Sequence, residues 1–437
     1  MFGENNPEAL IVGAGPVGQF AALALARRGV RVRVVDRGLW PCAQSYALAL
    51  HPKSMKLLAG LGLRDAVLSS ATMVDSIGLY DAKTRRASLP VADGAGDGVA
   101  VMRQDVLEGV LEQALKAEGV EIEWRNEVSR IAPGPSSVGV TIDKFTKESR
   151  GYVIAHTEWV ISKSTEIETP FVIGADGYNS RVRRASKLDF QEVGPAQYFA
   201  VFEFKTDADV NREMRIVFGE NTTDVVWPLP NGACRWSFEI PGYHDENLEG
   251  LQKGLLAAGF DFPSERSKER LFVSQGADSP LLEESSFRAM IAQRAPWFTG
   301  QVGEIVWKSI VRFERRLTSA FGDGRLWLAG DAAHLTGPVG IQSMNLGLAE
   351  ADELAAAIAG VIRKGEPAAS LEAYNQKWLG VWRQLHNLAG GVQASAGADP
   401  WLAAHASTLT SCLPAYGEDL GALAGKLGLT LARAAGA

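Results

Sequence analysis

The chain has 437 residues, more than one hydrophobic core usually serves, so two or three domains are expected. Its 44 basic and 51 acidic side chains give a net charge of −7 without a long run of one sign, which disfavours nucleic acid as a partner. Three widely separated cysteines and the lack of an apolar stretch of membrane-spanning length predict a cytoplasmic protein with no membrane span, disulfide framework or metal site.

The first expected elements form a βαβ unit. An apolar strand over residues 9–12 runs into Gly13-Ala-Gly-Pro-Val-Gly18, a helix then extends to about Arg28, and a second strand ends at Asp36. Gly13 would make the tight turn, Gly15 would let a pyrophosphate approach the backbone, and Gly18 would allow close packing of helix on strand. Asp36 would bind a ribose hydroxyl, so the unit predicts a dinucleotide site.

Two later segments also join a buried strand to a polar turn. The stretch 171–184 contains Asp176-Gly-Tyr-Asn-Ser-Arg-Val-Arg183, for which a simple Asp176–Arg183 ion pair is the structural alternative. The stretch 324–347 ends a strand at Gly330-Asp331 and leads through a Pro/Gly turn to a helix start. The unpaired amides and the positive dipole end of that helix would favour a polyol chain or a delocalised anion.

In this order and spacing, the three segments resemble the fingerprints of the group A flavin-dependent aromatic hydroxylases, the p-hydroxybenzoate hydroxylase-like family, over about residues 8–390. The resemblance implies an α/β fold with a Rossmann-like FAD-binding domain, an antiparallel β-sheet substrate domain and a helical C-terminal tail. The implied boundaries are 1–76, 98–190 and 318–375 for the discontinuous FAD-binding domain, 77–97 and 191–317 for the substrate domain, and 376–437 for the tail.

The resemblance also implies the chemistry. NADH or NADPH would reduce FAD as a transient co-substrate, and O2 would then be used to hydroxylate an aromatic small molecule, phenolic or polyketide- or quinolone-like, through a flavin C4a-hydroperoxide. The residues that it assigns to the cofactor are Gly13, Gly15, Pro16, Val17, Gly18, Asp36, Arg37, Arg103, Asp176, Gly330, Asp331, Gly340, Gln342, Ser343, Met344 and Asn345.

Several of these residues have distinct implied roles. Asp331 would accept hydrogen bonds from the ribityl hydroxyls, and residues 342–345 would present backbone amides to the pyrimidine edge of the flavin. Arg103, with Gln104, would lie near the phosphates and the ribityl chain. The alternative for Arg103 is an exposed arginine before a helix cap at Asp105.

The sequence departs from the family pattern in two places. The usual Gly-Gly-Gln-Gly is here Gly340-Ile-Gln-Ser343, and Tyr46 stands where the family commonly has an arginine. The first change would alter the mobility of the flavin or access to it, and the second would remove a phosphate contact and alter nicotinamide-dependent reduction. His334 is expected to be a satisfied structural histidine.

The middle of the chain predicts the substrate domain. Residues 198–204 and 214–218 alternate as strands do, and residues 224–230 and 233–240 form a hairpin signal across Asn231-Gly232. Cys234, Trp236, Phe238 and Ile240 share one face of the second hairpin strand, and Trp227 shares a face with Val225 and Leu229. The candidates for the substrate pocket are Trp227, Arg235 and Phe238.

The candidate catalytic residues are Pro338, Tyr46 and His51. Pro338 would lie near the oxygen-reacting edge of the flavin, and Tyr46 or His51 would orient or deprotonate a phenol. A packing role remains the alternative for each.

Two other functions stay open. The segment 236–241 looks like the Trp-x-Trp-x-Ile-Pro pattern of flavin-dependent halogenases with one substitution, and the altered residues 46, 341 and 343 would suit a flavin-binding protein that does not turn over.

The C-terminal part of the chain predicts a packed helix, because apolar residues follow helical spacing at Leu371, Tyr374, Trp378, Val381 and Leu385. The tail beyond it would cover the flavin domain or a neighbouring subunit, which leaves a homodimer open.

Overall fold

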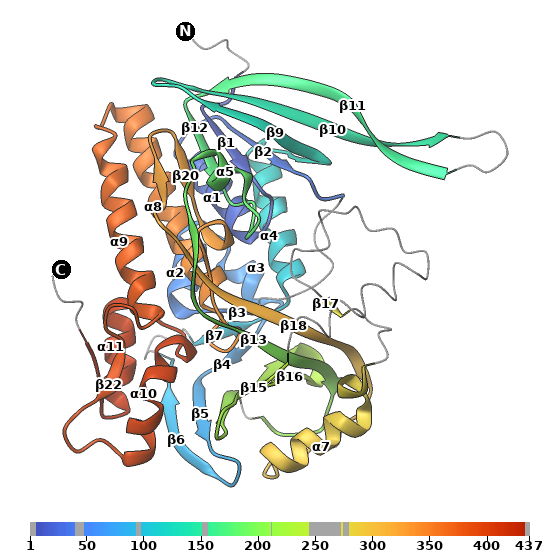
Figure 1. Ribbon diagram of the computed structural model, residues 1–437, viewed down its shortest axis with the longest axis vertical. Helices are drawn as coiled ribbons and strands as arrows, with labels where there is room; N and C mark the ends of the chain where they lie inside the picture. The colour runs from blue at the N-terminus through green and yellow to red at the C-terminus, as the bar shows by residue number, and fades with distance from the viewer. Residues whose placement is uncertain are drawn as a thin grey trace.

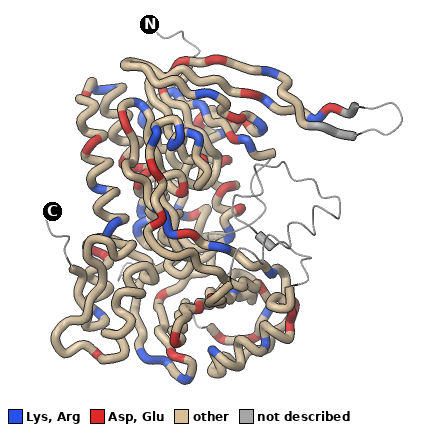
Figure 2. The backbone as a smooth tube through the Cα atoms, viewed as in Figure 1, with Lys and Arg blue, Asp and Glu red and all other residues tan. Residues whose placement is uncertain are grey.

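The computed structural model describes residues 6–39, 48–92, 98–150, 156–210, 212–243, 272–273 and 279–432 (Figure 1). Lys and Arg are interspersed with Asp and Glu over the whole fold (Figure 2). Within the described ranges, no helix combines the length and the apolar character needed to cross a membrane.

A six-stranded sheet, parallel apart from one edge strand, carries the first motif. Its order is β19-β20-β12-β1-β2-β8. The strands are β1 (Ala9–Val12), β2 (Val32–Asp36), β8 (Ile122–Trp124), β12 (Phe171–Gly174), β20 (Leu326–Leu328) and the antiparallel edge strand β19 (Gly322–Asp323). All four residues of β1 are buried, as expected for a parallel strand covered on both faces. Because β1, β12 and β20 are parallel neighbours, the three motifs that follow them meet at one edge of the sheet.

Helix α1 (Pro16–Arg27) connects β1 to β2, which confirms the predicted βαβ unit. Pro16 is its first residue, where the missing N–H costs nothing, and Gly29 follows its end with a φ of +76°. Helices α4 (Gln104–Ala117) and α8 (Gln342–Lys364) pack against α1. The shorter helices nearby are α2 (Pro52–Gly60), α3 (Arg64–Leu68) and α5 (Arg181–Ala185), with a one-turn 3-10 helix η3 (Gly330–Ala332).

A nine-stranded sheet forms the second layer. Its order is β17-β18-β13-β16-β15-β14-β5-β6, with β21 also paired to β18, and only the β14–β5 pair is parallel. The strands are β5 (Ser76–Tyr80), β6 (Arg85–Pro90), β13 (Phe190–Lys205), β14 (Glu213–Phe218), β15 (Thr223–Leu229), β16 (Ala233–Glu239), β17 (Phe272–Val273), β18 (Ile305–Thr318) and β21 (His334–Leu335).

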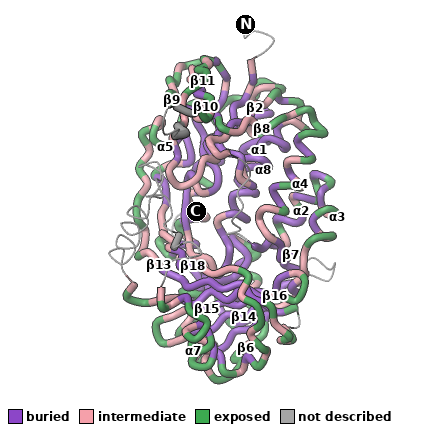
Figure 3. The backbone as a smooth tube through the Cα atoms, turned by 90° about the vertical axis from the view of Figure 1, so that its right-hand side faces the viewer, coloured by how far each residue is buried: buried purple, intermediate pink, exposed green. Residues whose placement is uncertain are grey.

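The predicted hairpin is confirmed, because β15 and β16 pair antiparallel across the 3-10 turn η1 (Pro230–Gly232). The two faces of this sheet serve different cores. Trp227 belongs to the core shared with the first sheet, whereas Trp236 and Phe238 belong to a second core that contains Phe287 of α7 (Glu284–Arg294). The 3-10 helix η2 (Pro280–Leu282) precedes α7. Figure 3 shows β14, β15 and β16 as buried strands with α7 beside them.

The other strands form three small sheets: β9 (Asn126–Pro133), β10 (Val138–Arg150) and β11 (His156–Thr169); β3 (Ala49–Leu50), β7 (Val99–Val101) and β4 (Thr72–Val74); and β22 (Val392–Ala394) with β23 (Leu429–Leu431). In Figure 1 the hairpin of β10 and β11 projects from the body as an arm.

The C-terminal region holds α9 (Ala369–Leu385), α10 (Pro400–Cys412) and α11 (Gly417–Lys426), and α9 packs along α8. Of the residues predicted to face inward from this helix, Val381 is half-buried, and its neighbour Trp382 takes the buried position. The residue boundaries of the domains stay a prediction.

Candidate cofactor site and active site

Two adjoining cavities lie where the three motifs meet. The outer cavity, of about 510 Å³, extends around Asp36, and the inner cavity, of about 210 Å³, extends to Pro338. They share the lining residues Gly15, Gln104, Ala175, Gly177 and Asp331. Each motif therefore contributes to a single hollow at the carboxyl ends of the parallel strands, which is where open α/β sheets bind ligands.

The first motif shapes the outer cavity. Gly13 has a φ of +103°, and a Cβ there would lie 2.2 Å from the carbonyl oxygen of Ala175, so only glycine fits this crossing. A Cβ on Gly15 would meet nothing within 4 Å, because it would point into open space. Asp36 accepts hydrogen bonds from the N–H of Ala14 (2.6 Å) and of Gly38 (2.5 Å), so its carboxylate is fixed at the cavity wall that Arg37 also lines.

The second motif also lines the outer cavity. Asp176 Oδ2 accepts from the N–H of Arg181 (2.7 Å), whereas its Oδ1 is buried and has no partner among the described residues. Burial raises the pKa of Asp176. The guanidinium of Arg183 donates to the carbonyl oxygens of Ala332 (2.6 Å) and Tyr178 (2.5 Å), not to Asp176, so it ties the second motif to the third. Burial lowers the pKa of Arg183 to about 10.

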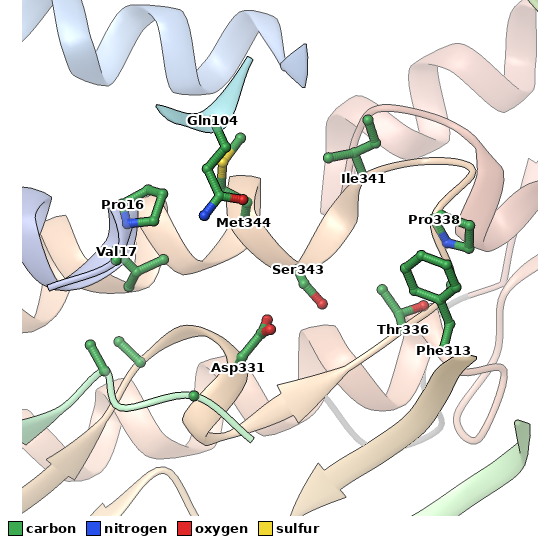
Figure 4. Close-up of a pocket in the computed structure, with 15 residues that line it drawn as sticks. Pro16, Val17, Gln104, Phe313, Asp331, Thr336, Pro338, Ile341, Ser343 and Met344 are labelled. Carbon is green, nitrogen blue, oxygen red and sulfur yellow. The ribbon is translucent and has the colours of Figure 1, made fainter. Parts of the chain in front are cut away.

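The inner cavity has apolar ends and a polar middle. In Figure 4, Pro338 and Phe313 lie at one end, Pro16 and Val17 lie at the other, and Asp331 and Ser343 lie between them, with Met344 also on the wall. Ser343 Oγ is buried with no partner in the described part of the chain. These unsatisfied oxygens and the open space over Gly15 fit a polar, elongated cofactor such as FAD.

The turn that leads into α8 is supported from behind. Ile341 has a φ of 49°, a left-handed conformation that costs a β-branched residue roughly 1–2 kcal/mol. The side chain of Asn345 donates to the carbonyl oxygens of Ile341 (2.8 Å) and Ala49 (2.9 Å) and accepts from the N–H of His51 (2.7 Å). Ile341 thus adopts the backbone shape that glycine prefers.

The residues next to Ile341 do not all face the hollow. Gly340 is absent from the lining of both cavities, because its carbonyl oxygen accepts from His51 Nε2 (2.8 Å) on the far side of the turn. The side-chain amide of Gln342 donates to the carbonyl oxygens of Leu413 and Ala415 (3.3 Å). Met344 and Ser343 are the residues of α8 that reach the inner cavity.

Of the three candidate catalytic residues, Pro338 lines the inner cavity. His51 lies behind the turn, is 2% exposed, and borders a separate cavity near α11. Burial lowers the pKa of His51 to about 4, so the ring is neutral at pH 7 and donates from Nε2. Tyr46 lies outside the described residues.

The pKa of His51 predicts a pH-dependent stability. Its folded value of about 4 lies below the ordinary 6.5, so the unfolded chain binds more protons and stability falls as the pH drops below 6.5. From pH 7.5 to pH 5, His51 should contribute a loss of about 2 kcal/mol in the free energy of unfolding. Urea denaturation at both pH values should show that the free energy of unfolding falls less in His51→Gln than in the parent. An equal loss in both proteins would contradict the buried, neutral His51.

Arg103 points to the second sheet. Its guanidinium donates to Glu203 Oε2 (3.0 Å), and Gln104, rather than Arg103, lines both cavities. Glu203 Oε1 also accepts from Arg235 Nε (2.8 Å), which makes an Arg–Glu–Arg cluster on the sheet. The cofactor contact of Arg103 therefore stays a prediction, and this geometry does not support it.

The candidate substrate residues lie on different faces of the second sheet. Trp227 and Arg235 are neighbours across the β15–β16 pair, on the face toward the first sheet, but neither lines the inner cavity. Phe238 lies on the opposite face, where it stacks on Trp236 with ring centroids 4.8 Å apart. Phe313 of β18 lines the inner cavity instead, and no local sequence signal distinguished it from the other apolar residues of this strand.

The two-layer fold and the hollow bounded by Gly13, Asp36, Asp176 and Asp331 define a dinucleotide-binding flavoprotein. The chain belongs to the FAD binding domain family, whose model matches residues 6–389. Among curated relatives, it is 28% identical over 390 residues to a 6-methylpretetramide 4-monooxygenase of Streptomyces rimosus, with 87% of this chain and 60% of that protein covered. The chain spans 50% to 65% of the length of the first three such relatives.

Solved structures show the same fold. A p-nitrophenol 4-monooxygenase from Pseudomonas putida DLL-E4 matches with a TM-score of 0.65 at 19% identity, with 97% of this chain and 94% of that chain covered. The flavin-dependent halogenase CmlS matches with a TM-score of 0.65 at 20% identity, with 88% of this chain and 63% of that chain covered. The fold is thus common to monooxygenases and to a halogenase.

Proposed function

We propose that the protein is an FAD-dependent monooxygenase that uses NADH or NADPH and O2 to hydroxylate an aromatic small molecule. The observation that carries the proposal is the continuity of the two cavities. A polar cradle for a dinucleotide leads, past Asp331 and Ser343, to an end lined by Phe313 and Pro338. The curated relative named above is a 6-methylpretetramide 4-monooxygenase, which supports a monooxygenase reaction.

Different residues of this chain would bind different parts of FAD. Gly15 and Asp36 would hold the adenosine end, Asp331 would accept from the ribityl hydroxyls, and the amides of residues 342–345 would face the pyrimidine edge. Bound FAD supplies the electron transfer and the activation of oxygen.

The inner end of the hollow would receive the aromatic ring. Phe313 packs edge-on against Phe199 with ring centroids 5.6 Å apart. This contact fixes the orientation of the Phe313 ring, which forms an apolar surface of the inner cavity. Pro338 adds an apolar surface that has no N–H to bind water. Both residues would help to exclude water from the reacting ring.

Two alternatives are retained as outcomes of the test. The segment that looks like the halogenase pattern places Trp236 and Phe238 in the core on the far side of the sheet, away from the inner cavity. Ile341 still adopts a left-handed turn, and Ser343 still lines the inner cavity. These two departures from the family pattern therefore do not favour a flavin-binding protein without turnover.

The proposal is tested by a screen of phenols, quinolones and polyketide aromatics with the FAD-loaded protein. A suitable compound should stimulate both NADH or NADPH oxidation and O2 uptake, and ¹⁸O2 should add one labelled oxygen atom to the product. Halide-dependent chlorination or bromination without a hydroxylated product would support the halogenase alternative. The absence of turnover with every compound and both nicotinamides would support a non-catalytic flavin protein.

The cellular setting belongs to the same proposal. We place the protein in the cytoplasm, with the aromatic substrate and O2 as its small-molecule partners, and a homodimer remains an alternative to the monomer.

A further inference from the structure

A buried carboxylate lies directly beneath the third motif. Glu350, in α8, has 0% of its surface exposed and lines neither cavity. Its Oε2 accepts from the backbone N–H of Gly330 (2.8 Å) and from His334 Nε2 (2.9 Å). Its Oε1 accepts from Trp382 Nε1 of α9 (2.7 Å). Three donors from three separate elements therefore converge on one side chain.

This arrangement specifies a carboxylate. The Gly330 N–H and the Trp382 Nε1–H can only donate, and His334 donates from Nε2 in the tautomer that faces an ionised carboxylate. A group with only acceptors satisfies all three, whereas an amide of the same shape would turn its NH2 toward Gly330 or Trp382, each of which is a donor. In a fully buried position, a donor that faces another donor has no acceptor and destabilises the folded protein. The indole of Trp382 also stacks on the His334 ring with centroids 3.8 Å apart, which restrains the plane of the imidazole.

The contact to Gly330 connects this cluster to the cofactor hollow. Gly330 has a φ of +65° and directly precedes Asp331, whose side chain lines both cavities. The direction in which Asp331 points depends on the backbone of this turn, and the Gly330 N–H is held by Glu350. On the other side, Arg183 holds the carbonyl oxygen of Ala332 (2.6 Å). The turn is thus fixed before and after Asp331.

We infer that Glu350 is a positioning residue, which holds Asp331 in place for the ribityl chain through the Gly330 amide, while His334 and Trp382 hold Glu350. The inference rests on the proposed role of Asp331 in the FAD site. It assigns His334 a structural task within the cluster, in line with its complete burial.

The main experiment measures the dissociation constants of FAD and of ADP for apoprotein carrying Glu350→Gln. FAD binding should weaken about tenfold or more, as expected when one buried hydrogen bond is replaced by a mismatch. ADP should bind as in the parent, because it lacks the ribityl chain to which Asp331 is proposed to bind. An equal loss for ADP would show general damage to the fold and overturn the inference.

The chain offers a matched control in Glu353→Gln. Glu353 lies one turn further along α8 and accepts from another tryptophan of α9, Trp378 Nε1 (3.2 Å), but its side chain is 37% exposed and its other recorded partner, Lys377, also lies on α9 and not in the Gly330 turn. Its replacement should change FAD affinity less than about twofold, because an exposed interaction contributes little. A tenfold loss in this control would overturn the inference.

A double-mutant cycle separates the positioning role from the site assignment. If Glu350 acts through Asp331, Glu350→Gln should cause no further loss of FAD affinity in an Asp331→Ala background. Fully additive losses, or unchanged affinity in Glu350→Gln alone, would overturn the positioning role. If Asp331→Ala itself left FAD affinity unchanged, the proposed flavin site would fail instead. Should Glu350→Gln not fold, Trp382→Phe removes one donor and keeps the stacked ring; unchanged FAD affinity in that variant would equally overturn the inference.

Discussion

Replacing Gly15 with valine is expected to give a colourless protein that folds as stably as the parent. Gly15 has φ −71° and ψ 178°, which valine adopts readily, and an added Cβ would meet no atom within 4 Å. The same open space is where a pyrophosphate must approach the backbone. The valine side chain would fill it, so FAD affinity should fall by at least about 100-fold, or about 2.7 kcal/mol.

Flavin absorbance after purification measures the loss of FAD binding. The urea midpoint of the apoprotein measures whether the stability is unchanged. Gly109→Val is the matched control, because Gly109 also has nothing within 4 Å of an added Cβ but lies on the exposed side of α4. That variant should remain yellow. Full flavin absorbance in Gly15→Val would show that the pyrophosphate does not lie over this turn.

Removing the carboxylate of Glu203 should strongly destabilise the protein through the second sheet. Glu203 and Arg235 are both 3% exposed, and Glu203 accepts from Arg235 on one side and from Arg103 on the other. Burial lowers the pKa of Arg235, and the charge of Glu203 opposes that shift. Glu203→Ala would leave the buried Arg235 guanidinium without the carboxylate that balances its charge, which should cost about 3–5 kcal/mol in the free energy of unfolding.

Urea denaturation of Glu203→Ala and of Glu118→Ala tests this expectation. Glu118 also pairs with an arginine, Arg27, but the two side chains are 35% and 33% exposed, so its loss should cost under about 1 kcal/mol. The double replacement Glu203→Leu with Arg235→Met should recover most of the stability, since both buried charges are removed and the remaining Arg103 side chain is 40% exposed. Equal costs for the two single variants would mean that the Glu203 pair is effectively solvated.

The parts of the fold that could be predicted from the sequence are those set by local pattern. The β1–α1–β2 unit and the β15–β16 hairpin each follow from periodicity and turn residues within about 30 positions of chain. The meeting of Gly13, Asp176 and Asp331 around one hollow followed from the family resemblance, and the parallel neighbours β1, β12 and β20 give it a physical cause.

The directions of individual side chains could not be predicted in this way. Arg103 and its partner Glu203 are 100 positions apart, and nothing near either residue indicates the other. Alternation correctly grouped Trp236 with Phe238 and Trp227 with Val225. It could not indicate which face of the sheet meets the cofactor, because that depends on the packing of whole layers, and so Trp227 and Phe238 were both assigned to one pocket. Glu350 stands among alanines in α8 and has no local pattern that distinguishes it from a surface residue.

The left-handed turn at Ile341 has a consequence for how the cofactor arrives. A β-branched residue keeps this conformation only because Asn345 and His51 hold the backbone on both sides of it. The conformational entropy of the turn is therefore lost when the chain folds, not when FAD binds. In the proposed site, an incoming flavin would meet amide donors that are already aligned, and the association step would need no ordering of this part of the protein.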